Sequence, residues 1–428
     1  MKRSGIRAVW AFFLAVQLCC FSACGTQQPN PSSLQQSESD GIAVPAGPRM
    51  EEAGALGKIL DFKQVCGQLP EGSAELSYCN VLCSNGRWFA CILESAVKDS
   101  NRESGYRHRQ TLILVSSETR EVRTVAESDD AREDPFRLVC LTDRRLFWMT
   151  ADETALDVMS TGIEGGEIFT SRLSCSWEQE WVHNFCASGS RAFWIAAEDG
   201  AARIMTACPE EGTSQVLYRV EDASQYYDPL FMPSGEHYFC WSADEQLFVL
   251  DADTLQQRSF ELEKDFLSLY RNQQLVYGDL LLLPGLPKSG QTGELTVIDL
   301  KTGEEKKKIA LASTPVTFVL CGERNLIYCD SKQLWLCDIE TEADSVFAVM
   351  RNVDTRSCRL LPCGENFAVN DLQSNHQLVV FSVKNRTRRV ITFPESQQEI
   401  TVGDGYLYYS PAEEEDSFLV RRFIDLSA

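Results

Sequence analysis

The sequence predicts an all-β fold, because short apolar strands and tight polar turns recur along most of its 428 residues. The clearest unit is Asn325–Thr341 (NLIYCDSKQLWLCDIET), in which a polar turn joins two apolar strands. Related first strands begin at residues 87, 145, 191, 237, 279, 366 and 405. With residue 325 included, consecutive starts lie 58, 46, 46, 42, 46, 41 and 39 residues apart, so the chain contains a structural repeat.

Each repeat is expected to hold four strands. An apolar strand and a tight turn precede the unit, as in Val81–Gly86, and a third strand follows it, as in Gln246–Thr254. A fourth, shorter strand comes next, as in Lys307–Leu311. Eight such repeats predict an eight-bladed β-propeller. Seven blades is the alternative, because Phe266–Gly285 can be divided in two ways.

The last repeat lacks a fourth strand, since little sequence remains before Ala428. Lys58–Phe62 (KILDF) lies ahead of the first repeat and is expected to supply that strand beside Ser417–Ile424. This pairing removes two exposed sheet edges, which otherwise invite aggregation. The propeller domain is therefore predicted to span residues 56–428.

Asp251, Asp299 and Asp338 share one position at the end of the third strand, where Ser116 and Ser382 also occur. A carboxylate or hydroxyl there can accept hydrogen bonds from the backbone of the following turn. Because the position repeats, we interpret these residues as turn-forming rather than catalytic.

The first 23 residues have the features of an export signal. Three basic residues precede Ala8–Ala23, a mostly apolar run of 16 residues, shorter than the ~20 residues that usually span a bilayer as a helix. The run ends in Phe21-Ser22-Ala23-Cys24, which resembles a bacterial lipobox with Phe21 in place of Leu. The resemblance implies a lipoprotein signal peptide over residues 1–23 and a lipid on Cys24, which would hold the protein at the extracytoplasmic face of the cell membrane. An ordinary signal peptide and an uncleaved anchor helix are the alternatives.

Residues 24–55 are predicted to be the lipidated cysteine and a disordered tether. This segment is rich in Gln, Ser, Pro and Gly and has no apolar periodicity. The whole chain has a formal net charge of −22. A strongly acidic surface repels nucleic acid, so we expect no nucleic-acid partner.

Of the 17 cysteines, 14 follow Cys24. Many replace apolar residues within predicted strands, and Cys83, Cys140, Cys186 and Cys321 share the end of the first strand of their repeats. We interpret most of them as small buried thiols rather than as a disulfide framework.

Two repeats, RLFWMTADETALDVMSTGIEGGE and RAFWIAAEDGAARIMTACPEEGT, resemble YWTD-type propeller repeats and bacterial relatives of unknown function. The segment ELTVIDLKTGE resembles the repeats of quinoprotein-like propellers. The resemblance covers roughly residues 58–428 and implies the fold, but it implies no active site.

No motif predicts catalysis, a metal site or a cofactor. The four histidines lack ligand partners at helical or strand spacing, and no nucleophile elbow or phosphate-binding loop occurs. The elements S-x-x-K at Ser95–Lys98 and K-T-G at Lys301–Gly303 match penicillin-binding enzymes, but their strand contexts do not. We therefore predict that the protein is not an enzyme.

The long connections between strands are predicted to leave the sheets on one face. Aromatic residues on loops over a rigid scaffold are typical of binding surfaces. We therefore expect a module that binds a glycan, a peptide or an envelope protein. A propeller hydrolase or lyase that acts on an extracellular polymer is the alternative, and a purely structural envelope component is the third. The candidate ligand-binding residues are Tyr106, Trp177, Trp181, Tyr226 and Tyr227.

Overall fold

The computed structural model divides the chain into Met1–Ile42 and Ala43–Ala428, and every residue described below belongs to the second unit. The described residues are 46–52, 58–61, 76–85, 87–98, 106–116, 118–128, 136, 138–151, 155–174, 181–198, 201–221, 230–234, 237–270, 273–286, 292–330, 333–349, 358–363, 365–371, 377–392, 400–403, 406–409 and 420–425.

Nearly every described element is a β-strand, as the sequence predicted. The helical elements among the described residues are η1 (Pro209–Glu211) and α4 (Phe266–Tyr270). No helix in this part of the chain is long and apolar enough to cross a membrane.

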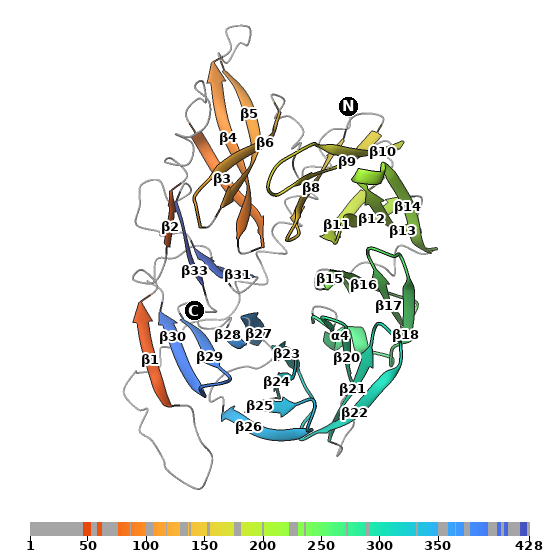
Figure 1. Cartoon of the computed structure of the whole chain (residues 1–428), viewed down its shortest axis with the longest axis vertical. Helices are drawn as coiled ribbons and strands as arrows, with labels where there is room; N and C mark the ends of the chain where they lie inside the picture. Colours follow the sequence, from red (N-terminus) through yellow and green to blue (C-terminus); the bar gives the residue numbers. More distant parts are fainter. Residues whose placement is uncertain are drawn as a thin grey trace, which may run out of the picture. The chain divides into compact units, whose positions relative to one another are not determined.

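Six antiparallel sheets each consist of four consecutive strands (Figure 1). The first three sheets contain β3 (Leu76–Ser84), β4 (Trp88–Lys98), β5 (Tyr106–Ser116) and β6 (Val122–Ser128); β7 (Leu138–Leu141), β8 (Arg145–Ala151), β9 (Ala155–Gly162) and β10 (Phe169–Ser174); and β11 (Trp181–Ser188), β12 (Arg191–Glu198), β13 (Ala201–Cys208) and β14 (Thr213–Val220). The next three contain β15 (Phe231–Ser234), β16 (Tyr238–Ala243), β17 (Gln246–Asp251) and β18 (Gln257–Glu261); β19 (Val276–Tyr277), β20 (Leu280–Pro284), β21 (Gly293–Asp299) and β22 (Glu305–Leu311); and β23 (Thr317–Cys321), β24 (Asn325–Cys329), β25 (Gln333–Asp338) and β26 (Ala343–Val349).

Two further sheets combine the C-terminal strands with strands from near the N-terminus, so seven sheets have four strands and one has five. The five-stranded sheet contains β27 (Cys358–Cys363), β28 (Asn366–Asp371), β29 (Gln377–Ser382), β30 (Thr387–Thr392) and β1 (Ala46–Glu52). The last sheet contains β31 (Ile400–Gly403), β32 (Tyr406–Tyr409), β33 (Val420–Asp425) and β2 (Lys58–Asp61).

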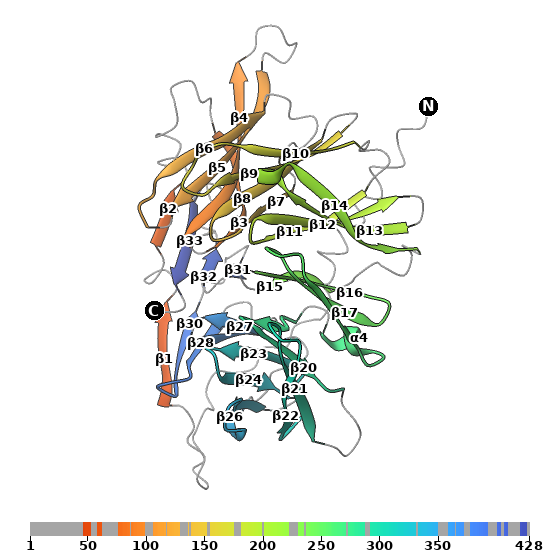
Figure 2. The ribbon, with the colours of Figure 1, turned by 45° about the vertical axis from the view of Figure 1, so that its right-hand side comes forward.

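The predicted pairing of the chain ends is confirmed. Strand β2 pairs antiparallel with β33, so that Lys58 lies opposite Phe423 and Asp61 opposite Val420 (Figure 2). Residues nearly 360 positions apart in the sequence therefore share one sheet, as the missing fourth strand of the last repeat required.

The predicted tether is too long in its C-terminal part. Strand β1 lies within residues 24–55 but pairs in parallel with β30, with Arg49 opposite Arg389 (Figure 2). Pro48 falls at an irregularity in this register, where its missing N–H removes no ladder bond. The segment AGPRMEE has no apolar alternation that would signal a strand. Main-chain hydrogen bonding to an open sheet edge does not need that alternation.

The strand register corrects the repeat boundaries by one residue in four of the eight repeats. Tyr238 lies opposite Asp251, at the position that Asn325 holds opposite Asp338. The predicted repeat starts placed His237 at the position of Arg191. This is wrong by one residue, because β16 begins at Tyr238 and His237 precedes it. Single-residue shifts are hard to detect where a whole strand is apolar, because the alternation that fixes register is absent.

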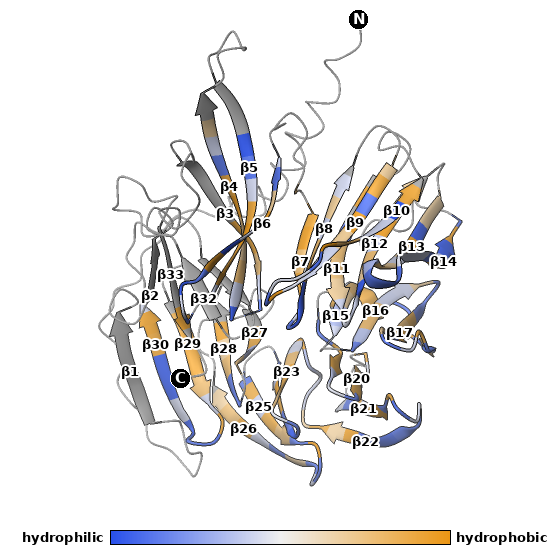
Figure 3. Cartoon of the chain, turned by 45° about the horizontal axis from the view of Figure 1, so that its top comes forward, coloured by the Kyte–Doolittle hydropathy of each residue, from blue (hydrophilic) through white to orange (hydrophobic). Residues whose placement is uncertain are grey.

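The sheets bury both faces against their neighbours. In β8, Leu146 and Trp148 belong to the core shared with the first sheet, whereas Phe147 and Met149 belong to the core shared with the third. Between the third and fourth sheets, the rings of two phenylalanines stack with centroids 4.1 Å apart. Figure 3 shows hydrophobic residues along strands such as β12 and β16 and hydrophilic residues on many turns. The near-continuous apolar strands are explained by this burial on both faces.

The repeated position at the end of the third strand forms turns, as predicted. Asp251 Oδ1 accepts hydrogen bonds from the backbone N–H groups of Asp253 (3.0 Å) and Thr254 (2.9 Å). Leu255 then adopts a left-handed conformation with φ 59° and donates its N–H to the Asp251 carbonyl. Side-chain acceptors at the equivalent turns are Asp299, Asp338, Ser116 and Ser382.

At one of these turns a neighbouring arginine also holds the acceptor. Arg324 Nε donates to Asp338 Oδ2 at 3.0 Å. Hydrogen bonding to Arg324 lowers the pKa of Asp338 to about 2. The carboxylate therefore remains charged, and able to accept both turn bonds, throughout the ordinary pH range.

We expect Asp251→Ala to lower the free energy of unfolding by about 1–2 kcal/mol, because two backbone donors lose their acceptor. Asp251→Ser is the matched control, since serine occupies this position in two other repeats. In urea unfolding, Asp251→Ser is expected to lose at most half as much stability as Asp251→Ala. Equal losses for the two variants would contradict the turn assignment.

A cation on the fourth strand connects each of several sheets to the next. Arg258 in β18 donates through Nε to the Leu300 carbonyl (2.9 Å) and through Nη2 to the Lys301 carbonyl (2.8 Å). Arg123 in β6 and Lys307 in β22 occupy the same register and bond carbonyls in the third-to-fourth-strand turn of the following sheet. We call these three side chains the inter-sheet latch.

Twelve cysteines lie among the described residues, and ten of them, all except Cys79 and Cys358, are seen as free thiols. Burial raises the pKa of Cys240 to about 12 and raises the pKa of Cys140 well above its ordinary value. Buried thiols of this kind are protonated and unreactive. Seven of the ten free thiols are buried and three are half-buried, which agrees with the interpretation of most cysteines as buried thiols in this part of the chain.

Candidate functional site

The residues predicted for ligand binding fall mainly outside the described part of the chain. Trp177, Tyr226, Tyr227 and the lipidation residue Cys24 are not among the described residues. Tyr106 begins β5 and lies opposite Lys98, and Trp181 begins β11 and lies opposite Ala197. By strand order, both positions adjoin connections that leave the sheets on the same face. The structure adds nothing on their side chains.

A cavity of about 820 Å³ opens at the other face, where the first and second strands of each repeat are joined. Ser84, Leu141 and Ser188 are the last residues of β3, β7 and β11, and all three line it. These first strands contact those of the neighbouring sheets, so the cavity lies where successive repeats meet. The turns after the three strands and parts of three later repeats complete the wall.

An arginine–glutamate pair from neighbouring repeats forms one part of the wall. Arg145 begins β8, and its Nη1 contacts Glu210 Oε1 of η1 in the following repeat. Arg145 Nη2 also donates to Ser160 Oγ at 3.1 Å, and its guanidinium lies 5.3 Å from the centroid of the Phe169 ring. The charge of Glu210 is therefore balanced by Arg145, and the ion pair connects two neighbouring repeats.

A histidine–aspartate pair forms another part. His237 Nδ1 lies 3.0 Å from Asp253 Oδ2, so the two side chains form a hydrogen bond at the surface. Gly189 allows the approach of Asp253: a Cβ at Gly189 would lie 2.8 Å from Asp253 Oδ1, and its φ is +57°. A side chain at position 189 would therefore displace one wall of the cavity.

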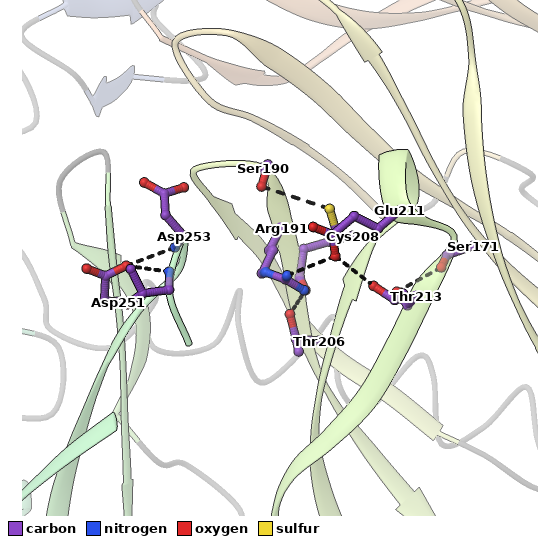
Figure 4. A network of polar contacts seen from close by, with 11 residues as sticks. Ser171, Ser190, Arg191, Thr206, Cys208, Glu211, Thr213, Asp251 and Asp253 are labelled. Carbon is purple, nitrogen blue, oxygen red and sulfur yellow. Dashed lines mark hydrogen bonds and ion pairs between the residues drawn. The ribbon is translucent and has the colours of Figure 1, made fainter. Parts of the chain in front are cut away.

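A second layer of polar contacts supports these turns (Figure 4). Buried Arg191 donates to Glu211 Oε2 at 3.1 Å, and the same carboxylate oxygen accepts from the Thr213 hydroxyl at 3.2 Å. Ser190 lines the cavity, and its Oγ lies 3.9 Å from Cys208 Sγ. Figure 4 shows Ser190 and Asp253 on separate turns at the same edge of the network.

Three polar groups in the cavity wall lack a partner among the described residues: Ser188 Oγ, Arg145 Nε and the Arg144 guanidinium. Ser188 is 1% exposed, and its Oγ has no hydrogen-bond partner. Arg144 is exposed, and its guanidinium makes no ion pair with any described residue. Buried hydroxyls are normally hydrogen-bonded, so the unpaired Ser188 Oγ leaves an unused donor in the cavity wall.

The arrangement is suited to binding polar molecules. Its wall offers hydroxyls, two amides, one histidine and two arginines beside apolar surface from residues such as Met232 and Pro233. No group of three or more metal-ligating side chains occurs within the described residues. The sequence pointed to the long-loop face and missed this site. The available signal was the charged residue before or at the start of the second strand, as in Arg144, Arg145 and His237.

The K-T-G segment is also structural. Gly303 has φ +78° in the turn after β21, and Lys301 Nζ pairs with Asp279 Oδ2 at 2.5 Å. Both residues lie outside the cavity wall. The segment therefore lies in the turn after the third strand of its repeat, as its sequence context indicated.

Repeated four-stranded antiparallel sheets, packed in sequence and joined at the chain ends, define a β-propeller. Comparison with protein-family models finds no match, and neither does comparison with curated proteins.

The chain resembles several solved structures in outline. BamB from Moraxella catarrhalis is 11% identical, with 81% of this chain and 98% of that chain covered and a TM-score of 0.41. The WD40 domain of SCAP from fission yeast is 8% identical, with 87% of this chain and 98% of that chain covered and a TM-score of 0.46. The β-propeller domain of the Trilobed protease from Pyrococcus furiosus is 9% identical, with 72% of this chain and 93% of that chain covered and a TM-score of 0.37.

Proposed function

We propose that the protein is an extracytoplasmic binding module, held at the cell membrane by a lipid on Cys24 and built as an eight-bladed β-propeller. Eight successive sheets, with β2 completing the last, support the blade number. The observation that carries the proposal is the cavity, whose wall comes from six repeats and contains an unpaired buried hydroxyl. Its ligand is a glycan, a peptide or part of an envelope protein.

The anchor is tested by Cys24→Ala. Labelling of growing cells with a fatty-acid analogue is expected to mark the wild-type protein and not the variant. Membrane retention should be lost as well, because lipoproteins carry more than one acyl chain and a single chain binds only marginally. Equal labelling of both forms would refute the anchor.

The binding site is tested on a glycan array and a peptide library with the full chain. Ser190→Trp fills the cavity from a partly exposed position and is expected to reduce wild-type signals at least tenfold with an unchanged Tm. A variant with Trp177, Trp181, Tyr226 and Tyr227 replaced by alanine tests the predicted long-loop surface, which we propose as a second contact for a macromolecular partner. It is expected to weaken capture while most of the fold remains.

The outcomes separate the two surfaces. Full signals from Ser190→Trp would exclude the cavity as the site. A fall in Tm in the alanine variant as large as that caused by deleting β2 would instead identify those aromatics as core residues. The proposal that these aromatics form a second binding surface would then be wrong.

A hydrolase or lyase that acts on an extracellular polymer is the second candidate. The specific observation in its favour is that Asp143, Glu210, His237 and Asp253 converge on the cavity. Against it, Glu210 is paired with Arg145 and Asp253 with His237, so neither carboxylate is free for acid–base chemistry. Turnover of a polymer by the wild type and its loss in His237→Gln would favour the enzyme over the binding module.

A further inference from the structure

Most charged side chains around the cavity have a partner within the protein, and one does not. Glu210 contacts Arg145, and Asp253 is hydrogen-bonded to His237. Asp143 also takes part in an interaction. Among the described cavity-lining residues, Arg144 is the charged side chain without an ionic partner. The cavity therefore contains one cation that a ligand can neutralise.

The remaining unpaired groups are hydrogen-bond donors. Ser188 Oγ has no partner at 1% exposure, and Arg145 Nε is buried and without a partner. Together with the exposed Arg144 guanidinium, these two buried donors complement a ligand rich in acceptor oxygens. A guanidinium binds carboxylate and phosphate oxygens with two parallel hydrogen bonds, and such charge-assisted bonds are stronger than neutral ones.

We propose that the cavity binds a polar small molecule or ligand terminus that bears an oxyanion, with Arg144 as its ionic contact and Ser188 as a hydrogen-bond donor. This inference rests on the proposed function and names the chemistry of the ligand. The cavity volume of about 820 Å³ has room for such a group together with a sugar ring or a few amino-acid residues. The oxyanion is a carboxylate or a phosphate.

The test compares three probes that share one sugar ring: glucuronate, glucose 6-phosphate and glucose. The full chain is titrated with each probe, and Tm and calorimetric Kd are measured. At least one charged probe is expected to raise Tm in a concentration-dependent way, because a ligand that binds only the native state stabilises it. Glucose is expected to bind at least tenfold more weakly. The stronger charged probe identifies the preferred oxyanion.

Variants locate the site. Arg144→Gln is expected to weaken binding of the preferred anion by about 10–100-fold, because a charge-assisted pair is lost. Its Tm without ligand should stay unchanged, since Arg144 is exposed and unpaired. Ser188→Ala is expected to weaken binding several-fold and to leave Tm unchanged or higher, because it removes a buried hydroxyl without a partner.

Arg324→Gln is the matched control. Arg324 precedes the second strand of its repeat as Arg144 does, but it is paired with Asp338 and lies outside the cavity wall. It should lower Tm slightly and leave anion binding unchanged. Equal binding of glucose and the anions, or full binding by Arg144→Gln, would overturn the proposal. No Tm shift with either anion would overturn it too, while array signals that Ser190→Trp removes would still support a binding module.

Discussion

Deleting residues 25–62 is expected to lower Tm sharply, whereas deleting residues 25–45 should leave it unchanged. Strand β2 pairs with β33 through four residue pairs, and β1 pairs with β30 through five. Loss of the main-chain bonds of β2 alone removes about 2–6 kcal/mol. That is a large share of a typical stability of about 5–15 kcal/mol.

An intermediate deletion of residues 25–54 separates the two strands. It removes β1 and leaves β2, so it should give a smaller fall in Tm, because parallel pairing is slightly weaker per residue. Circular dichroism melting of the three deletions gives the comparison. A sharp fall in Tm on deletion of residues 25–45, or no fall on deletion of residues 25–62, would contradict the pairing of these strands.

The inter-sheet latch gives the second large expected effect. Gly303→Ala should lower the free energy of unfolding by about 2–4 kcal/mol. The residue has φ +78°, which strains alanine, and the added Cβ would overlap Arg258 Nη1. The side chain of Arg258 would have to leave its two carbonyl acceptors in the next sheet.

Two controls isolate the latch from backbone strain. Gly322→Ala has a similar φ of +63° and open space around the new methyl group, so it measures strain alone. Arg258→Ala removes the latch without strain. In urea unfolding, the double variant with Gly303→Ala should lose less than the sum of the two single losses, because both remove the same hydrogen bonds. Strict additivity, or a Gly322→Ala loss as large as that of Gly303→Ala, would disprove the latch.

The fold class followed from the sequence because it depends on local patterns. Apolar strands of similar length at a regular spacing indicated repeated sheets, and the repeated Asp251, Asp299 and Asp338 indicated turns. Both signals involve residues within about one repeat of each other. The pairing of Lys58–Asp61 with the last strand also followed, since a repeat that lacks one strand requires an edge partner.

Strand β1 and the repeat register were decided by the tertiary structure. The pairing of Ala46–Glu52 with β30 uses main-chain groups, which every sequence carries, so no residue pattern announces it. The one-residue shift at His237 could be recognised only from the partner strand, because Tyr238–Trp241 is apolar on both faces.

The candidate site shows the same division. The sequence indicated aromatics on long connections, but it could not show that residues from six repeats enclose a cavity. Ser188, Arg144 and His237 belong to three different repeats, and Asp253 reaches the site because Gly189 lacks a side chain. The sequence by itself determined the repeated strands, their turns and the pairing of Lys58–Asp61 with the last strand. Which side chains share the cavity, and which of them lack partners, depends on contacts between repeats and was decided by the tertiary structure alone.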